Sequence, residues 1–203
     1  MIKSDREYRN FALLEQPQDE ENKYQVEGYA STFEPYVLLN IDGEDYSERI
    51  DPNAFDDADM TDVVFLLDHS GRVYARTKNN TVTLTVDEHG LQTRIDLSKT
   101  EAARSVAEDI AVGNYSQMSF AFSVAKDHFD TETRTRVIDR IKKVYDISAV
   151  AFPANPYTDI GLSMRDYFNG EIEAMKEAER LQREAEELER RREEIKLRAL
   201  GGN

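Results

Sequence analysis

Three polar residues in largely apolar surroundings have the types that acyl-transfer chemistry uses: a histidine, a serine and an aspartate. His69 follows the apolar run Val63–Leu67 and precedes Ser70 and Gly71, so we expect it where a buried strand enters a turn. A rigid strand that ends at an accessible loop can hold an imidazole in position to accept a proton. The alternative is a histidine that only makes hydrogen bonds within the turn.

The serine and the aspartate lie in two later segments that read as strands. Ser119 is near the start of the apolar segment Met118–Val124, which would keep bulk water from its hydroxyl, and a nucleophilic serine also needs a neighbouring base. Asp146 lies within the run Val144–Val150, where a buried carboxylate would need a cationic or hydrogen-bonding partner. The alternatives are a packing serine and a solvent-facing aspartate. If folding joins both residues to His69, they form a Ser–His–acid arrangement.

Other kinds of reactive site have little support in the sequence. It contains no phosphate-binding loop, dinucleotide fingerprint, HExxH zinc motif or calcium loop. His89 and His128 lie in polar turns and are expected at the surface. With no cysteine, disulfides, thiol catalysis and cysteine metal sites are excluded. We therefore expect neither a metal nor a cofactor.

The overall composition restricts the possible partners. The 203 residues include 41 acidic and 26 basic side chains, a net charge of −15, which opposes binding to nucleic-acid phosphates. No stretch approaches the roughly 20 apolar residues of a membrane helix, and residues 1–10 lack the apolar core of a signal peptide. The 10 tyrosines and 9 phenylalanines argue against general disorder. We expect a cytosolic-type globular domain without direct contact to nucleic acid or membrane.

Strand-like patterns dominate the body of the chain. The predicted strands cover residues 23–30, 63–67, 81–86, 91–97, 118–124, 135–141 and 144–152. Because turn residues Asp87–Gly90 separate two of them, residues 81–97 are predicted to form a hairpin. Many short strands with few helices predict an α+β fold with a mainly β-barrel core, closed or nearly closed.

Two helices are expected to interrupt the strands. Ser98 is predicted to cap a helix that continues to Val112, with Glu101 completing a capping box. Asp51 is predicted to cap a short helix through Phe55.

The composition changes near residue 170. Residues 171–203 contain 10 acidic and 8 basic side chains, no proline and no aromatic residue, so the net acidity belongs to the body. Glutamate precedes arginine by four residues in several pairs, which predicts a long charged helix. The pairs are Glu179/Arg183, Glu186/Arg190, Glu187/Arg191 and Glu194/Arg198. A seam with Leu181, Leu188 and Ile195 is interrupted by Arg192 and is too thin for a strong coiled coil.

These patterns divide the chain into an N-terminal extension (1–20), a β-barrel domain (21–165) and a charged helical tail (166–203). The tail is either a solvated helix beside the domain or a helix that docks onto an assembly partner.

Several short fragments, in this order, resemble the HK97-like prohead protease family of tailed bacteriophages. The fragments are Glu27–Phe33, Ile50–Phe55, Val64–His69, Gly90–Leu91, Gly113 with Gln117–Phe122, Asp146–Val150 and Phe152–Pro156. The resemblance implies a serine endopeptidase with a β-barrel core related to herpesvirus assembly proteases. It makes His69 the general base and Ser119 the nucleophile. Asp146 stands where the family usually carries glutamate, and Ala121 stands where a glycine is usual.

The resemblance also implies the biological setting. Such an enzyme acts in the host cytoplasm inside the immature capsid, the prohead. Its substrates are the scaffold or the scaffolding segment of the major capsid protein, and itself; the portal or shell and a second copy of the chain are further partners. The tail would dock the enzyme and be removed on maturation. The oxyanion donors stay open between backbone amides and Arg134, Arg136 or Arg140. The alternative function is a non-enzymatic capsid assembly or scaffolding protein with the same barrel and tail.

Overall fold

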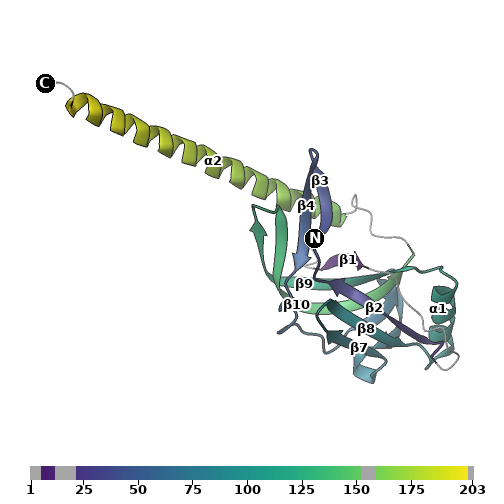
Figure 1. Cartoon of the computed structure of the whole chain (residues 1–203). Helices are drawn as coiled ribbons and strands as arrows, with labels where there is room; N and C mark the ends of the chain where they lie inside the picture. Colours follow the sequence, from purple (N-terminus) through teal and green to yellow (C-terminus); the bar gives the residue numbers. More distant parts are fainter. Residues whose placement is uncertain (1–5, 12–21, 152–158, 201–203) are drawn as a thin grey trace. The chain divides into compact units, whose positions relative to one another are not determined.

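The computed structural model describes residues 6–11, 22–151 and 159–200 (Figure 1). The strands are β1 (Glu7–Phe11), β2 (Gln25–Thr32), β3 (Tyr36–Ile41), β4 (Glu44–Ile50), β5 (Val64–Leu67), β6 (Ser70–Arg76), β7 (Val82–Val86), β8 (Gly90–Asp96), β9 (Gln117–Asp130) and β10 (Thr135–Val150). The helices are α1 (Glu101–Ala111), α2 (Asp159–Leu200) and the 3-10 turn Thr77–Asn79. The family-like fragment Phe152–Pro156 lies outside the described residues.

The larger sheet is built around β10. Its seven strands run in the order β1-β9-β10-β4-β3, and β5 and β6 branch from β10. β9 pairs antiparallel with β10 over most of its length, whereas β4 and β5 pair parallel with the two ends of β10. The continuous apolar run of β5 suits this place, because a parallel strand beside a central strand is covered on both faces.

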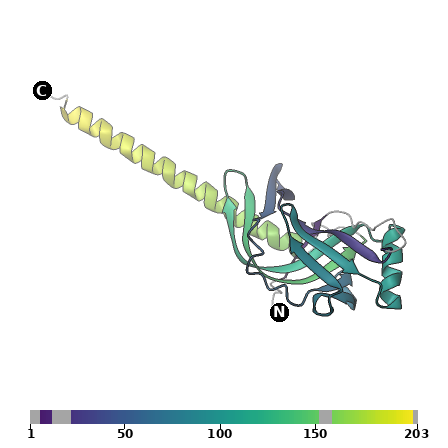
Figure 2. The same ribbon diagram turned by 60° about the horizontal axis from the view of Figure 1, so that its bottom comes forward.

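The smaller sheet has the order β2-β8-β7, and its antiparallel β7–β8 pair confirms the predicted hairpin over residues 81–97. One hydrophobic core cluster contains side chains from both sheets, with Leu91 and Ile95 from the smaller sheet and Phe65 and Phe120 from the larger sheet all fully buried. Burying each such side chain contributes about 1.5–3 kcal/mol. Figure 2 shows the two sets of strands from a second direction.

The mixed α+β class is confirmed, but the closed barrel is not formed by the described strands. β10 has two parallel partners along one side, so the larger sheet branches there instead of curling back on itself. The two sheets are packed through side chains and share no strand pairing.

Local predictions around the helices were partly wrong. The N-cap of α1 lies two residues later than expected: the Thr100 hydroxyl accepts a hydrogen bond from the Ala103 amide at 3.1 Å, so Thr100 and not Ser98 is the cap. The expected helix from Asp51 to Phe55 is instead a series of turns, in which the Asp51 carboxylate accepts from the Asn53 amide at 3.0 Å.

The last two predicted body strands are in fact the single strand β10. Four register shifts occur between β9 and β10 from Ile138 to Asp146, and one of them, between Ile141 and Lys143, lies where the two predicted segments were separated. Such bulges bend and twist a strand without ending it.

Helix α2 contains part of the predicted charge pattern. Glu179–Arg183 and Glu187–Arg191 form ion pairs at 3.3 and 2.7 Å. The seam residues Leu181, Leu188 and Ile195 are 52, 52 and 67% exposed. Within the described residues, neither helix is long and apolar enough to cross a membrane.

Candidate active site

His69 lies in the two-residue turn that joins β5 to β6. Asp68 and His69 both have positive φ angles, 46° and 54°, as a tight type I′-like hairpin turn requires. For residues other than glycine such a conformation costs about 1–3 kcal/mol each, so surrounding contacts must hold it. The Asp68 amide donates to the Ala149 carbonyl at 3.1 Å, and the His69 amide donates to the Ser148 hydroxyl at 3.2 Å. The turn is therefore attached to β10.

Ser119 and Asp146 come from the β9–β10 pair. Ser119 lies directly opposite Ser148 in the antiparallel register. Asp146 is two residues before Ser148 and therefore on the same face of β10. Both are buried, Ser119 at 0% exposure and Asp146 at 3%. Because β5 runs parallel to β10 with Val64 opposite Asp146, the chain leaving β5 brings His69 to the same face.

The structure brings all three predicted residues together. His69 Nε2 lies 2.7 Å from Ser119 Oγ, and Nδ1 lies 2.6 Å from Asp146 Oδ1. The shorter aspartate therefore reaches the imidazole. The Ser148 hydroxyl donates to the same Asp146 oxygen at 3.0 Å, a support that the sequence analysis missed.

The series of a carboxylate, an imidazole and a hydroxyl can activate the serine oxygen for nucleophilic attack. A carboxylate beside Nδ1 fixes the imidazole tautomer that leaves Nε2 free to accept the serine proton, and the serine oxygen then becomes nucleophilic. Burial strengthens these polar interactions because little water competes for the same atoms.

The other histidines lie elsewhere. The side chains of His89 and His128 are 70 and 54% exposed, in agreement with the predicted surface positions. His128 Nδ1 lies 3.0 Å from Asp139, and the two form a second Asp–His pair. Across the described ranges, no group of three or more acidic or histidine side chains is arranged to hold a metal ion.

Strand β1 is a part of the site that the sequence analysis did not anticipate. It pairs antiparallel with the free side of β9 and places Asn10 opposite Ser119. The Ser119 hydroxyl donates to the Arg9 carbonyl oxygen at 2.9 Å. The Tyr8 and His69 rings pack edge to face, with their centroids 4.6 Å apart. The serine has one proton to donate, so the Arg9 carbonyl competes with His69 for it.

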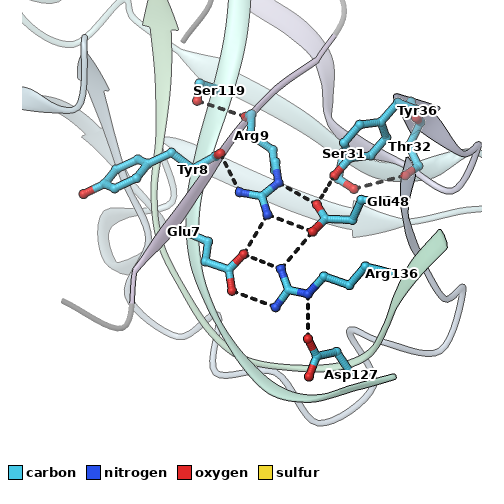
Figure 3. Close-up of polar contacts among 10 residues, drawn as sticks. All are labelled: Glu7, Tyr8, Arg9, Ser31, Thr32, Tyr36, Glu48, Ser119, Asp127 and Arg136. Carbon is cyan, nitrogen blue, oxygen red and sulfur yellow. Dashed lines mark hydrogen bonds and ion pairs between the residues drawn. The ribbon is translucent and has the colours of Figure 1, made fainter. Parts of the chain in front are cut away.

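A network of buried charges connects β1 to the rest of the larger sheet (Figure 3). Arg9 makes two hydrogen bonds to Glu48 of β4, at 2.5 and 2.8 Å, and one to Glu7 at 2.7 Å. Arg136 of β10 binds Glu7 at 2.7 Å, Glu48 at 2.9 Å and Asp127 at 2.6 Å. Glu48 is fully buried, as a carboxylate can be only with such partners.

The network shifts the pKa values of its members. Burial alone would raise the pKa of Glu7, but hydrogen bonds and positive charge from Arg136 and Arg9 outweigh it and lower that pKa below 4.5. Burial opposes the charge of Arg9, yet the Glu48 carboxylate raises the pKa of this guanidinium well above its ordinary value. Both side chains are therefore held in their charged forms.

The lowered pKa predicts that Glu7 stabilises the fold only when ionised. The contribution of Glu7 to the free energy of unfolding is fully present above its unfolded-state pKa of 4.5. It is lost as the pH falls through the lowered pKa that Glu7 has in the folded state. Wild-type protein should therefore melt at a higher temperature than Glu7→Gln at about pH 7, and the gap should narrow toward about pH 3. Thermal melting followed by circular dichroism measures it.

The control is Glu88→Gln, whose carboxylate is 88% exposed and should show no such gap. A gap between wild type and Glu7→Gln that stayed constant on acidification would contradict the proposed origin of the pKa shift.

The three arginines considered as oxyanion donors already have carboxylate partners. Arg136 belongs to the buried network, Arg134 pairs with Glu44 at 2.6 Å, and Arg140 lies 3.8 Å from Asp57. Of the three, Arg136 is the buried one.

Comparison with known proteins agrees with this geometry. Residues 12–173, well over half of the chain, match the family model described as caudovirus prohead serine protease. Searches of the curated proteins and of the solved structures each found no match. The matched residues include both sheets except β1, and they include His69, Ser119 and Asp146. The chain therefore belongs to the family of caudovirus prohead serine proteases.

Proposed function

We propose that this capsid maturation protease is a Ser–His–Asp endopeptidase that cleaves the scaffold or the scaffolding segment of the major capsid protein, and also itself. Ser119 is the nucleophile, His69 the general base and Asp146 the acid that orients the imidazole. The observation that carries the proposal is the continuous series of short contacts from the Ser119 hydroxyl through both His69 nitrogens to the buried Asp146 carboxylate.

The reaction is acyl transfer in two halves. His69 Nε2 accepts the Ser119 proton while the serine oxygen forms an ester bond with the substrate carbonyl carbon. The peptide C–N bond then breaks, and the leaving amine takes the proton from the imidazolium. In the second half water gives a proton to His69 as its oxygen attacks the ester carbon; the ester C–O bond then breaks, the serine oxygen takes the proton back from the imidazolium, and the acid product leaves. Asp146 stabilises the positive charge that His69 carries in both halves.

Ser148 is a positioning residue in this scheme. Its hydroxyl donates to Asp146 and accepts from the His69 amide, so it connects the orientation of the carboxylate to that of the turn. It touches no reacting atom.

Coexpression with the major capsid protein and scaffold tests the proposal. Wild-type protein should shorten one of them, and intact-mass measurement should give the cut sites, whereas Ser119→Ala should leave both substrates and the chain itself uncut. The non-enzymatic alternative, an assembly or scaffolding protein, predicts that both samples contain only full-length proteins and that shells still form.

We propose further that the helical tail docks the protease onto scaffold or shell inside the prohead and is removed on maturation. The support is the exposed apolar seam on an otherwise charged helix, since Leu181 and Leu188 are each 52% exposed. Leu181→Glu with Leu188→Glu should reduce the amount of protease that copurifies with proheads by about tenfold, as for a few exposed apolar anchors.

The matched control is Gln182→Glu, which adds the same charged side chain beside the seam. Quantitative mass spectrometry of purified proheads gives the amount retained. Equal retention of the seam variant and the control would exclude docking through this seam.

A further inference from the structure

The strand β1 has the position of a bound peptide relative to the proposed nucleophile. It adds to the free edge of β9, the strand that carries Ser119, and it places a backbone carbonyl, that of Arg9, 2.9 Å from the serine oxygen. Proteins commonly bind extended peptides in this way, with main-chain hydrogen bonds at a sheet edge for affinity and side-chain pockets for selectivity. The family match begins at residue 12, so β1 lies outside the matched residues.

The side chains of β1 show what the neighbouring pockets accept. Residues two apart on a strand face the same side, and accordingly Glu7 and Arg9 both enter the charge network of the larger sheet. The Arg9 guanidinium is 3% exposed and binds both oxygens of Glu48. The Glu7 carboxylate binds Arg136 through two guanidinium nitrogens at 2.7 and 3.0 Å.

The charges that remain when β1 is left out are opposite: Glu48 and Arg136 are register partners in the parallel β4–β10 pairing, and they contact each other at 2.9 Å. Glu48, on β4, offers a fully buried carboxylate to Arg9, the residue whose carbonyl faces Ser119. The Tyr36 hydroxyl also donates to the Glu48 carboxylate. Arg136, on β10, offers its guanidinium to Glu7, two positions before Arg9, and it also binds Asp127 and Glu48. A buried carboxylate discriminates strongly between arginine and neutral side chains, because a neutral side chain in the position of Arg9 leaves the carboxylate with an unfilled hydrogen-bonding position.

We propose that β1 occupies the substrate-binding position of this protease, and that Glu48 and Arg136 select extended peptides with arginine immediately before the cleaved bond and an acidic residue two positions earlier. This inference rests on the Ser119 nucleophile of the proposed function. The substrate class is thus Glu-Xaa-Arg in a strand conformation, and Glu48 is the residue that determines the preference for arginine. β1 itself acts as a competing occupant, since its carbonyl takes the hydrogen bond of the Ser119 hydroxyl.

Two peptides and full-length protein test the specificity. The first peptide copies residues 4–13, SDREYRNFAL, with a fluorophore and quencher at its ends, and the second carries the change R9Q. The chain's own β1 competes equally with both, so the ratio of their kcat/KM values does not depend on how much of the site β1 fills. Wild-type protein should favour the arginine peptide by at least about 100-fold. Mass spectrometry should place the cut after the arginine equivalent to Arg9 and not after that equivalent to Arg6, which has Ser4 two positions before it.

Glu48→Gln should reduce this ratio to below about tenfold, because the neutral amide no longer distinguishes a guanidinium from an amide side chain. The matched control is Glu27→Gln, which removes a carboxylate paired with Arg94 at 2.7 Å on the smaller sheet and should keep the wild-type ratio. If Glu48→Gln does not fold, as judged by circular dichroism, the wild-type ratio still decides the question.

The outcomes separate this inference from the proposed function. Equal cleavage of the two peptides, or cleavage of neither, by a protein that cuts capsid protein or scaffold would overturn the inference and leave the serine endopeptidase intact. A strong arginine preference that persists in a folded Glu48→Gln would overturn the role of Glu48. Failure to cut capsid protein, scaffold and both peptides would remove the proposed function and the inference with it.

Discussion

Replacing Ser119 with alanine should lower kcat/KM for a cleaved substrate by about 10⁵–10⁶-fold, because the acyl-enzyme can no longer form. The change deletes one oxygen from a fully buried position, and it leaves His69 and Asp146 with their mutual contact. Initial rates of capsid protein or scaffold cleavage, measured at matched enzyme concentration, give the effect. Circular dichroism should show an unchanged fold.

The matched control is Ser123→Ala. Ser123 lies four residues further along β9 and is equally buried, but its hydroxyl lies 3.4 Å from that of Tyr145 and not beside an imidazole. It should retain nearly all activity. Loss of activity in both variants would point to damage of β9, and full activity of Ser119→Ala would rule out this serine as the nucleophile.

Asp146→Asn should reduce kcat by about 10³–10⁴-fold with little change in KM. The amide has the size of the carboxylate, but it neither fixes the productive tautomer of His69 nor stabilises its positive charge. Because Asp146 accepts from both His69 and Ser148, the neutral side chain also weakens the support of the turn. Steady-state kinetics on one substrate separate the two parameters.

Two comparisons sharpen this second test. Asp139 lies on β10, as Asp146 does, and pairs with His128 of β9. Asp139→Asn removes this exposed Asp–His contact and should leave kcat unchanged. Asp146→Glu keeps the carboxylate charge and lengthens the side chain by one methylene, so its loss of kcat should be far smaller than that of Asp146→Asn. A kcat for Asp146→Asn within about tenfold of wild type would show that the carboxylate charge has no part in the reaction.

Much of the site was predictable because its members lie on strands with clear apolar patterns. The run of β5, the start of β9 and the end of β10 are each apolar enough to be recognised, and the order of short family-like fragments linked His69, Ser119 and Asp146 before any contact was known. The pairings that join them, β5 with β10 and β9 with β10, explain why residues far apart in sequence meet on one face.

The strands that the sequence analysis did not predict are β1, β3, β4 and β6, and two of them, β1 and β4, have charged residues at buried positions. In β4 the residues facing inward include Glu48, and among the β1 side chains whose burial is described the buried one is Arg9, so neither segment shows the usual alternation of apolar and polar residues. Each of these charges is tolerated because an opposite charge meets it from a distant part of the chain. Apolar periodicity cannot reveal such strands, and the substrate-like position of β1 could not be predicted from it.

The error at the start of α1 has a local cause. Ser98 and Thr100 are both good caps, and the choice between them depends on which hydroxyl reaches the Ala103 amide.

The expectation of a closed or nearly closed barrel failed because a sequence pattern predicts strands and not their pairing. The pattern did not indicate that β10 has two parallel partners.

The distance along the chain between β1 and its partner has a consequence for the newly made protein. Ser119 and Arg9 are 110 residues apart, and a ribosome adds about 5–20 residues per second, so β1 is made roughly 5–20 s before the opposing segment of β9. During translation β1 has no strand to pair with, and the edge that it will cover does not yet exist. Once that edge appears, β1 is already tethered beside it, ahead of any peptide that must arrive by diffusion.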